Sequence, residues 1–185
     1  MKGSRVRADA RDNRARIMTA ADEIFGRSPN ASTDDVARQA GVGIATVFRH
    51  FPTKTELLEA VLTLRLERLR DRALELAGSD DPGAAFYSFF TQVVSESASK
   101  LAIAQALIAA GSAAGEDAQK AGRGMREAFD ILLTEAQRSG AVRTDAAFPE
   151  VYALLVGASR GATAVDLEPA TRDKMLALVY DGLKP

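Results

Sequence analysis

Residues 33–51 read TDDVARQAGVGIATVFRHF, and this stretch predicts two short helices joined by a tight glycine turn. Gly41 can end the first helix in a left-handed conformation at no steric cost, and Pro52 ends the second. The residues that must pack the two helices together are apolar: Val36, Ala37, Ala40, Val42 and Val47. This layout is that of a helix-turn-helix, whose second helix enters the major groove of DNA.

The second of these helices carries side chains that suit contact with DNA. Thr46 can bond a base edge and offer its methyl group to thymine, while Arg49 can pair with guanine or with phosphate. Ala45 is also left to face outward. Two packed helices that bind no DNA remain the alternative for such a pattern taken alone.

The rest of the chain also shows helical periodicity, and signals for strands are nearly absent. The sequence therefore predicts an all-α protein with about nine helices. The first runs from about residue 12 to Gly26, and the next two are those of the helix-turn-helix. The fourth runs from the Thr53-x-x-Glu56 capping box to near Gly78, and two more lie around residues 86–94 and over residues 101–110. The seventh holds Met125 and ends at Gly140, and the last two begin near Pro149 and Pro169.

Composition limits the classes of function. The 185 residues are 46% hydrophobic and include no cysteine and one histidine, so we expect no disulfide, no metal site and no other cofactor. Residues 1–16 lack the apolar stretch of a secretory signal, and no run approaches the ~18 apolar residues of a membrane span. We therefore expect a cytoplasmic protein with no membrane partner.

Charge divides the chain into a basic head and an acidic body. Residues 1–54 hold ten basic and six acidic residues, whereas residues 55–185 hold 14 basic and 19 acidic ones. This asymmetry suggests that only the head meets a polyanion, although chance fluctuation explains so small a difference equally well. Arg5, Arg7 and Arg11 either form an arm that reaches DNA or belong to an ordinary tail.

Residues 33–58, which read TDDVARQAGVGIATVFRHFPTKTELL, resemble the TetR family of bacterial repressors. The similarity runs over roughly residues 12–62, and its distinctive core is Thr46-x-x-x-His50-Phe51-x-x-Lys54 after a leading Gly41-Val42. The resemblance implies a homodimer in which helices 1–3 bind a palindromic operator. Helices 4–7 would form a ligand pocket, and helices 8 and 9 would form the four-helix bundle of the dimer.

The resemblance also implies roles for individual residues. Thr33 and Lys54 would contact phosphates, Phe48 and His50 would contact the DNA backbone, and the groove would be faced by Gly43, Ile44, Ala45, Thr46 and Arg49. Phe48 departs from the family pattern because the family usually has tyrosine there. A phenylalanine cannot donate a hydrogen bond to phosphate, so that contact is expected to be apolar or absent.

We place the DNA-binding domain at residues 1–54 and the ligand-binding and dimerisation domain at residues 55–185. A largely apolar effector would be held by aromatic and methionine side chains, for which the candidates are Phe86, Phe89, Phe90, Met125 and Phe129. Candidates for the dimer interface are Val151, Leu154, Leu155, Ala158, Met175, Leu176 and Val179.

Three alternatives remain open at this point. The aromatic stripe around Phe86 and Phe129 is more often a packed core than a ligand pocket. The protein would then bind DNA without sensing a small molecule, or would respond to a protein partner. An enzyme on a helical bundle is the least favoured alternative, because one histidine and no cysteine leave little for a catalytic triad.

Overall fold

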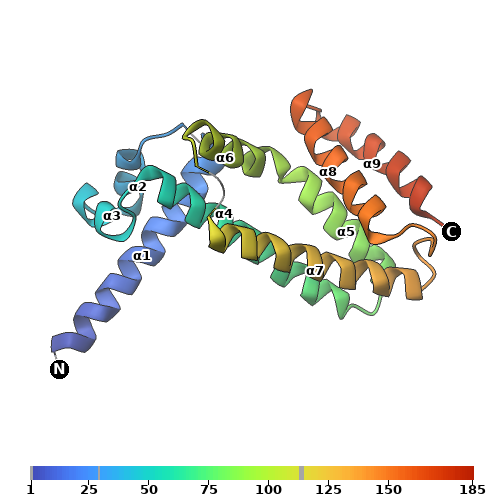
Figure 1. Cartoon of the computed structure of the whole chain (residues 1–185), viewed down its shortest axis with the longest axis horizontal. Coiled ribbons are helices and arrows are strands. Elements are labelled where there is room, and N and C mark those ends of the chain that lie inside the picture. Colours follow the sequence, from blue (N-terminus) through green and yellow to red (C-terminus); the bar gives the residue numbers. More distant parts are fainter. Residues whose placement is uncertain (1, 29, 113–114) are drawn as a thin grey trace. The chain divides into compact units, whose positions relative to one another are not determined.

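The computed structural model describes residues 2–28, 30–112 and 115–185, with side chains from residue 9 onward. Within these ranges the chain is helical, with no strand, which confirms the all-α prediction (Figure 1). The helices are α1 (Lys2–Arg27), α2 (Thr33–Ala40), α3 (Ile44–His50), α4 (Lys54–Ala77), α5 (Pro82–Ser95), α6 (Ser97–Ala109), α7 (Glu116–Arg138), α8 (Phe148–Ala164) and α9 (Pro169–Leu183). None of these described helices is long and apolar enough to cross a membrane.

Two helices begin earlier than the sequence predicted. α1 begins at Lys2 rather than near residue 12, and α6 begins at Ser97 rather than at Leu101. The early part of α1 is rich in arginine and alanine, which favour helix, but it lacks the apolar stripe that the prediction relied on. α6 follows α5 after Glu96 alone, so no glycine or proline marks the boundary between them.

The helix ends follow the local chemistry of the sequence. The hydroxyl of Thr53 accepts a bond of 3.1 Å from the backbone N–H of Glu56 at the start of α4. Pro82, Pro149 and Pro169 all lie in the first turn of a helix, where a missing N–H costs nothing. The predicted starts of α4, α8 and α9 are therefore confirmed.

The chain forms two compact units. Unit 1 comprises Met1–Arg65 and Ala102–Gln119, and unit 2 comprises Leu66–Leu101 and Lys120–Pro185. The division falls inside α4, α6 and α7, so it does not coincide with the functional boundary that we predicted after residue 54. That boundary stays a prediction about roles.

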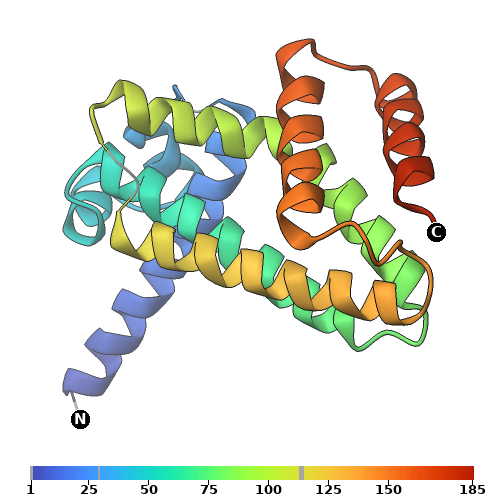
Figure 2. The ribbon, with the colours of Figure 1, turned by 45° about the vertical axis from the view of Figure 1, so that its right-hand side comes forward.

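Unit 1 is held together by an apolar core and a bridge between α1 and α4. Ile17 and Phe25 of α1, together with Leu57 of α4, are fully buried in this core. Beside it, the guanidinium of Arg65 donates to the carboxylate of Asp22 at 2.6 Å and to the backbone carbonyl of the same residue at 2.7 Å. This bridge ties α1 to α4, and α2 and α3 pack against α1 (Figure 2).

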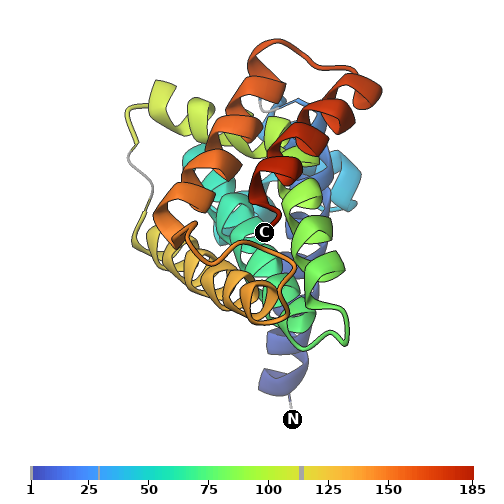
Figure 3. The ribbon, with the colours of Figure 1, turned by 90° about the vertical axis from the view of Figure 1, so that its right-hand side faces the viewer.

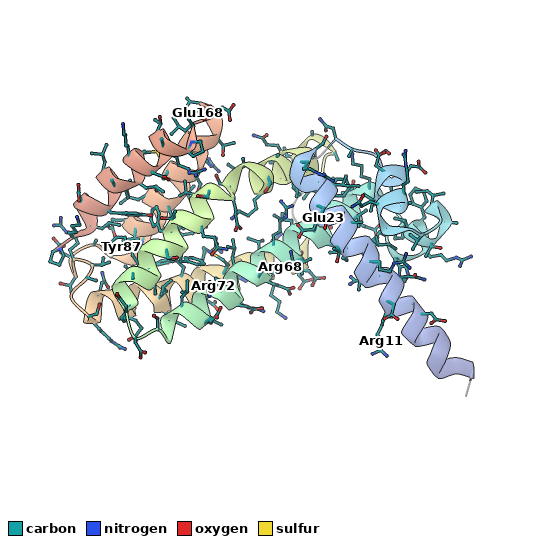
Figure 4. All side chains as sticks on the ribbon, turned by 180° about the vertical axis from the view of Figure 1, so that it is seen from behind. Arg11, Glu23, Arg68, Arg72, Tyr87 and Glu168 are labelled. Atoms are coloured by element: carbon teal, nitrogen blue, oxygen red, sulfur yellow. The ribbon has the colours of Figure 1, made fainter. Side chains whose placement is uncertain are left out.

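Unit 2 has a separate core built from α4, α5, α7, α8 and α9. α7 runs alongside α4 in this unit, where Gly124 leaves room for the side chain of Arg70 (Figure 2). α8 and α9 lie side by side (Figure 3). Tyr180 of α9 shares a hydrogen bond of 2.6 Å with Thr91 of α5. Tyr87 of α5, labelled in Figure 4, donates to the carbonyl of Ala141 at 3.1 Å. These bonds fasten α9 and the segment after α7 to α5.

Candidate nucleic-acid interface

The turn between α2 and α3 is built on one glycine. Gly41 has φ of 63° and ψ of 38°, the left-handed conformation expected from the sequence. Its N–H bonds the carbonyl of Arg38, and the N–H of Val42 bonds the carbonyl of Ala37 at 3.0 Å. α2 therefore ends directly before Gly41. Gly43 has an extended conformation, and α3 begins at the next residue.

Arg16 of α1 stabilises this turn through hydrogen bonds to two backbone carbonyls. Its guanidinium donates to the carbonyl of Ala40 at 2.6 Å and to that of Gly41 at 2.9 Å. Both acceptors belong to the end of α2, where helical carbonyls lack partners of their own. The sequence analysis missed this contact because an arginine bound to backbone carbonyls leaves no pattern in a sequence.

Replacing Gly41 by alanine is expected to destabilise unit 1 by about 1–3 kcal/mol. The alanine would have to keep the left-handed φ of 63°, and its Cβ would lie 2.8 Å from Nη2 of Arg16. Urea unfolding followed by circular dichroism measures the loss. Gly43→Ala is the matched control, because its φ is −69° and only Thr46 Oγ1 lies near, at 4.0 Å. Equal stability of both variants would contradict this account.

Val47 is the one fully buried residue of α3, and the other side chains of this helix are exposed or half-buried. Val47 is fully buried against α1 and α2, with Phe51 beside it. The residues predicted to face the groove lie elsewhere on the helix: Gly43, Ile44, Ala45 and Arg49 are exposed, and Thr46 is half-buried. Phe48 is exposed and His50 half-buried, so the structure leaves every predicted α3 contact at least partly accessible.

The two predicted phosphate contacts outside α3 lie at helix starts. Thr33 is the first residue of α2 and Lys54 the first of α4, and both are half-buried. The ammonium of Lys54 lies over the ring of Phe25, 5.7 Å from its centroid. A helix N-terminus carries a partial positive charge, so both positions suit an anion.

The start of α2 is held by a capping box that Ser32 and Asp35 form. The Ser32 hydroxyl accepts from the Asp35 N–H at 3.1 Å, and the Asp35 carboxylate accepts from the Ser32 N–H at 3.0 Å. The side-chain hydrogen bond from Ser32, followed by the backbone one, lowers the pKa of Asp35 below its usual value. The box therefore supports α2 at neutral pH and is lost as the pH falls through that lowered pKa.

Two more arginines lie on α1 near this surface. The guanidinium of Arg14 lies over the ring of Phe51 at 5.2 Å, and Arg11 is exposed and points away from α1 (Figure 4). The side chains of Arg5 and Arg7, predicted as parts of a possible arm, lie outside the described residues. The backbone there is helical rather than an irregular tail.

The residues predicted to hold a ligand lie together in the core of unit 2. Phe86, Phe89, Phe90 and Phe129 are fully buried, and Met125 is nearly so. Phe86 and Phe129 stack with ring centroids 5.7 Å apart, and Phe89 lies 5.5 Å from Phe129. The structure brings these side chains together as a packed cluster, and their role as a pocket stays a prediction.

The predicted dimer residues divide into two groups. Val151, Leu155 and Leu176 are buried in the core of unit 2 and so do not lie on its surface. Leu154 is 43% exposed, and the half-buried residues are Ala158, Met175 and Val179. Leu178 of α9, which the prediction did not name, is 76% exposed.

Two short helices joined by a tight turn at a glycine, with the outer surface of the second helix exposed, define a helix-turn-helix protein. The chain adds a further helical unit to this motif. Residues 17–61 match the model of the bacterial regulatory proteins of the TetR family, and residues 81–185 match the C-terminal domain of SbtR-like transcriptional regulators. The chain belongs to the TetR family of transcriptional regulators. Members of this family are DNA-binding regulators and not enzymes, which argues against the enzyme alternative.

Solved structures agree with this assignment. A TetR regulatory protein from Mycobacterium vanbaalenii is 33% identical with a TM-score of 0.79, over 97% of this chain and 99% of its own. A TetR regulator from Streptomyces coelicolor is 29% identical with a TM-score of 0.75, over 93% and 98% of the two chains. Both likenesses extend over nearly the whole chain and so include both units.

Curated sequences match this chain over about a third of its length. The uncharacterised HTH-type regulator TtgW of Pseudomonas putida is 45% identical over 60 residues, which are 31% of this chain and 45% of that protein. The match thus spans less than half the length of that relative.

Proposed function

We propose that this protein is a transcriptional repressor that binds a palindromic operator as a homodimer and is released by a small, largely apolar ligand. The observation that carries the proposal is the open outer surface of α3, beside a rigid turn fixed by Gly41 and Arg16. A rigid turn matters because groove contacts need a helix held in one orientation. We propose Thr46 and Arg49 as polar contacts to base edges, with phosphates bound by Thr33, His50 and Lys54.

Dimerisation is proposed through the outer faces of α8 and α9. Leu154 and Leu178 are large apolar side chains left exposed on these helices. On α8, a Cβ added at Gly157 or Gly161 would meet no atom within 4 Å, so a second helix can approach that face closely. A twofold dimer presents two recognition helices to half-sites about one DNA turn apart, which is why the operator is proposed to be palindromic.

Release by a ligand requires a ligand that binds the released form more tightly than the DNA-bound form. The support for a ligand is family membership, because the candidate residues form a closed cluster. Rings packed at 5.5–5.7 Å with no exposed surface favour a second candidate, a regulator that binds DNA without a small molecule. Replacement of Phe129 by alanine tests whether this cluster can serve as the pocket.

The test of DNA binding uses the full chain and a duplex containing the region upstream of its own gene, titrated at several salt concentrations. We expect tight, sequence-selective binding whose logarithm falls linearly with the logarithm of salt concentration, because phosphate contacts release counterions. Weak binding that does not depend on sequence, both here and in a duplex library of random sequence, would argue against a regulator.

Lys54→Ala is expected to weaken binding to all sequences about equally and to reduce the salt slope by about one. The reason is the loss of one phosphate charge without the loss of any base contact. Lys120→Ala removes the same charge from the exposed surface of α7 and is expected to leave the slope unchanged. An unchanged slope in Lys54→Ala would show that this lysine does not contact phosphate.

A further inference from the structure

The outer face of α3 is mostly apolar, which is unusual for a surface that meets DNA. We define this face as Ile44, Ala45, Thr46, Phe48 and Arg49. We infer that it recognises thymine through the C5-methyl groups in the major groove, with Ile44 and Phe48 as the residues that determine this preference. The inference rests on the proposed function, because it names the chemistry that the same surface would select in an operator.

Ile44 and Phe48 are exposed without a structural reason. Ile44 is 36% exposed and Phe48 45%, whereas Val47 between them is fully buried and holds α3 in place. Residues four apart lie on the same side of a helix, so the two side chains form one apolar patch. Leaving such side chains in water forgoes the favourable burial of apolar surface, so we expect a partner to cover them.

The major groove offers one apolar group on its base pairs, and this group is the C5-methyl of thymine. Ile44, Ala45 and Phe48 can neither donate nor accept a side-chain hydrogen bond, so they cannot read the donors and acceptors of the other bases. The methyl group of Thr46 adds to the same surface. Methyl recognition is therefore the form of direct base readout that these side chains can perform.

The spacing on the helix also fits consecutive bases. Ile44 and Phe48 are separated by about 6 Å along the axis of α3. Two base-pair steps rise by about 6.8 Å along one DNA strand. Each half-site is thus expected to carry thymines about two steps apart, with Arg49 beside them available for a guanine or a phosphate.

The absence of a hydroxyl group on Phe48 supports this assignment. A phenyl ring has no hydroxyl to donate to phosphate. An exposed ring gains little against a charged phosphate but gains from burial against a methyl group. We therefore assign Phe48 to the bases together with Ile44, rather than to the DNA backbone as the resemblance implied.

The experiment first selects bound duplexes from a random library and derives the operator from them. Each thymine of one half-site is then replaced by deoxyuridine, which removes the methyl group and keeps every hydrogen-bonding group. At the contacted thymines we expect affinity to fall about fourfold for each methyl removed. Thymines outside the half-sites are expected to tolerate the replacement.

Ile44→Ala and Phe48→Ala complete the comparison. Both side chains are exposed and alanine favours helix, so the variants are expected to fold. In Phe48→Ala the fourfold effect of one deoxyuridine should disappear, which is the coupling that a double-mutant cycle measures. Ile108→Ala, on an exposed isoleucine of α6, serves as the matched control and should keep the full effect.

The outcomes separate this inference from the function it rests on. Selective binding in which no deoxyuridine lowers affinity overturns the methyl readout and leaves the regulator intact. A deoxyuridine effect that persists unchanged in both Ile44→Ala and Phe48→Ala overturns the assignment to these residues. Failure of the library to yield any preferred sequence overturns the proposed function and this inference together.

Discussion

Phe129→Ala is expected to lower the free energy of unfolding by about 3–5 kcal/mol, because it leaves a cavity in a packed core. The ring of Phe129 is fully buried and lies within 6.4 Å of the rings of Phe86, Phe89 and Phe90, measured between centroids. Urea unfolding followed by circular dichroism measures the loss. The protein concentration has to be held constant, because the stability of a dimer depends on it.

Phe148→Ala is the matched control. Phe148 also contacts Phe129, with ring centroids 6.0 Å apart, but its side chain is only half-buried. Its replacement is expected to cost clearly less. A loss of less than about 1 kcal/mol in Phe129→Ala would mean that the cluster tolerates an empty volume, as a ligand pocket does, and would favour the ligand-released repressor. The larger loss would assign these rings to the packed core, and a ligand would then have to bind elsewhere in unit 2.

The helix-turn-helix was predictable because its signals are local. The Ser32–Asp35 box, the left-handed Gly41 and the buried Val47 all act within a few residues of one another. Such patterns specify a structure whatever the rest of the chain does. The early start of α1 was not predictable in the same way, because its first turns have no apolar face from which a period can be read.

The contacts that shape the candidate site depend on residues far apart in the chain. Arg16 reaches Ala40 and Gly41, and Arg65 reaches Asp22, but neither pairing follows from spacing along the sequence. The inclusion of residues 102–119 in unit 1 likewise depends on Ile103 and Leu107 entering the core of the head. Periodicity indicates that a helix has a buried face, but it does not indicate which core receives that face.

α8 illustrates the same limit at the predicted dimer surface. Val151 and Leu155 are buried and Leu154 is exposed, although all three belong to one run of apolar residues. The packing of α8 against α5 decides which residues turn inward. Sequence analysis therefore grouped core and surface residues together, and the proposed interface is better described by Leu154 with the open glycines Gly157 and Gly161.

Leu178→Arg is expected to convert the protein to a monomer and to lower its affinity for the operator by about 10²-fold or more. A twofold interface contains each residue twice, so one substitution places two positive charges in the contact. A monomer binds each half-site separately and loses the advantage of linked binding. Because Leu178 is 76% exposed, the arginine should leave the folding of each protomer nearly unchanged.

Analytical ultracentrifugation measures the molecular mass in solution, and fluorescence anisotropy with a labelled operator measures the affinity. Ile131→Arg introduces the same charge at an exposed apolar residue of α7 and is expected to remain dimeric with unchanged affinity. A dimeric Leu178→Arg with full affinity would place the interface elsewhere. A monomer that kept full affinity would instead show that one recognition helix suffices, which would contradict the palindromic operator.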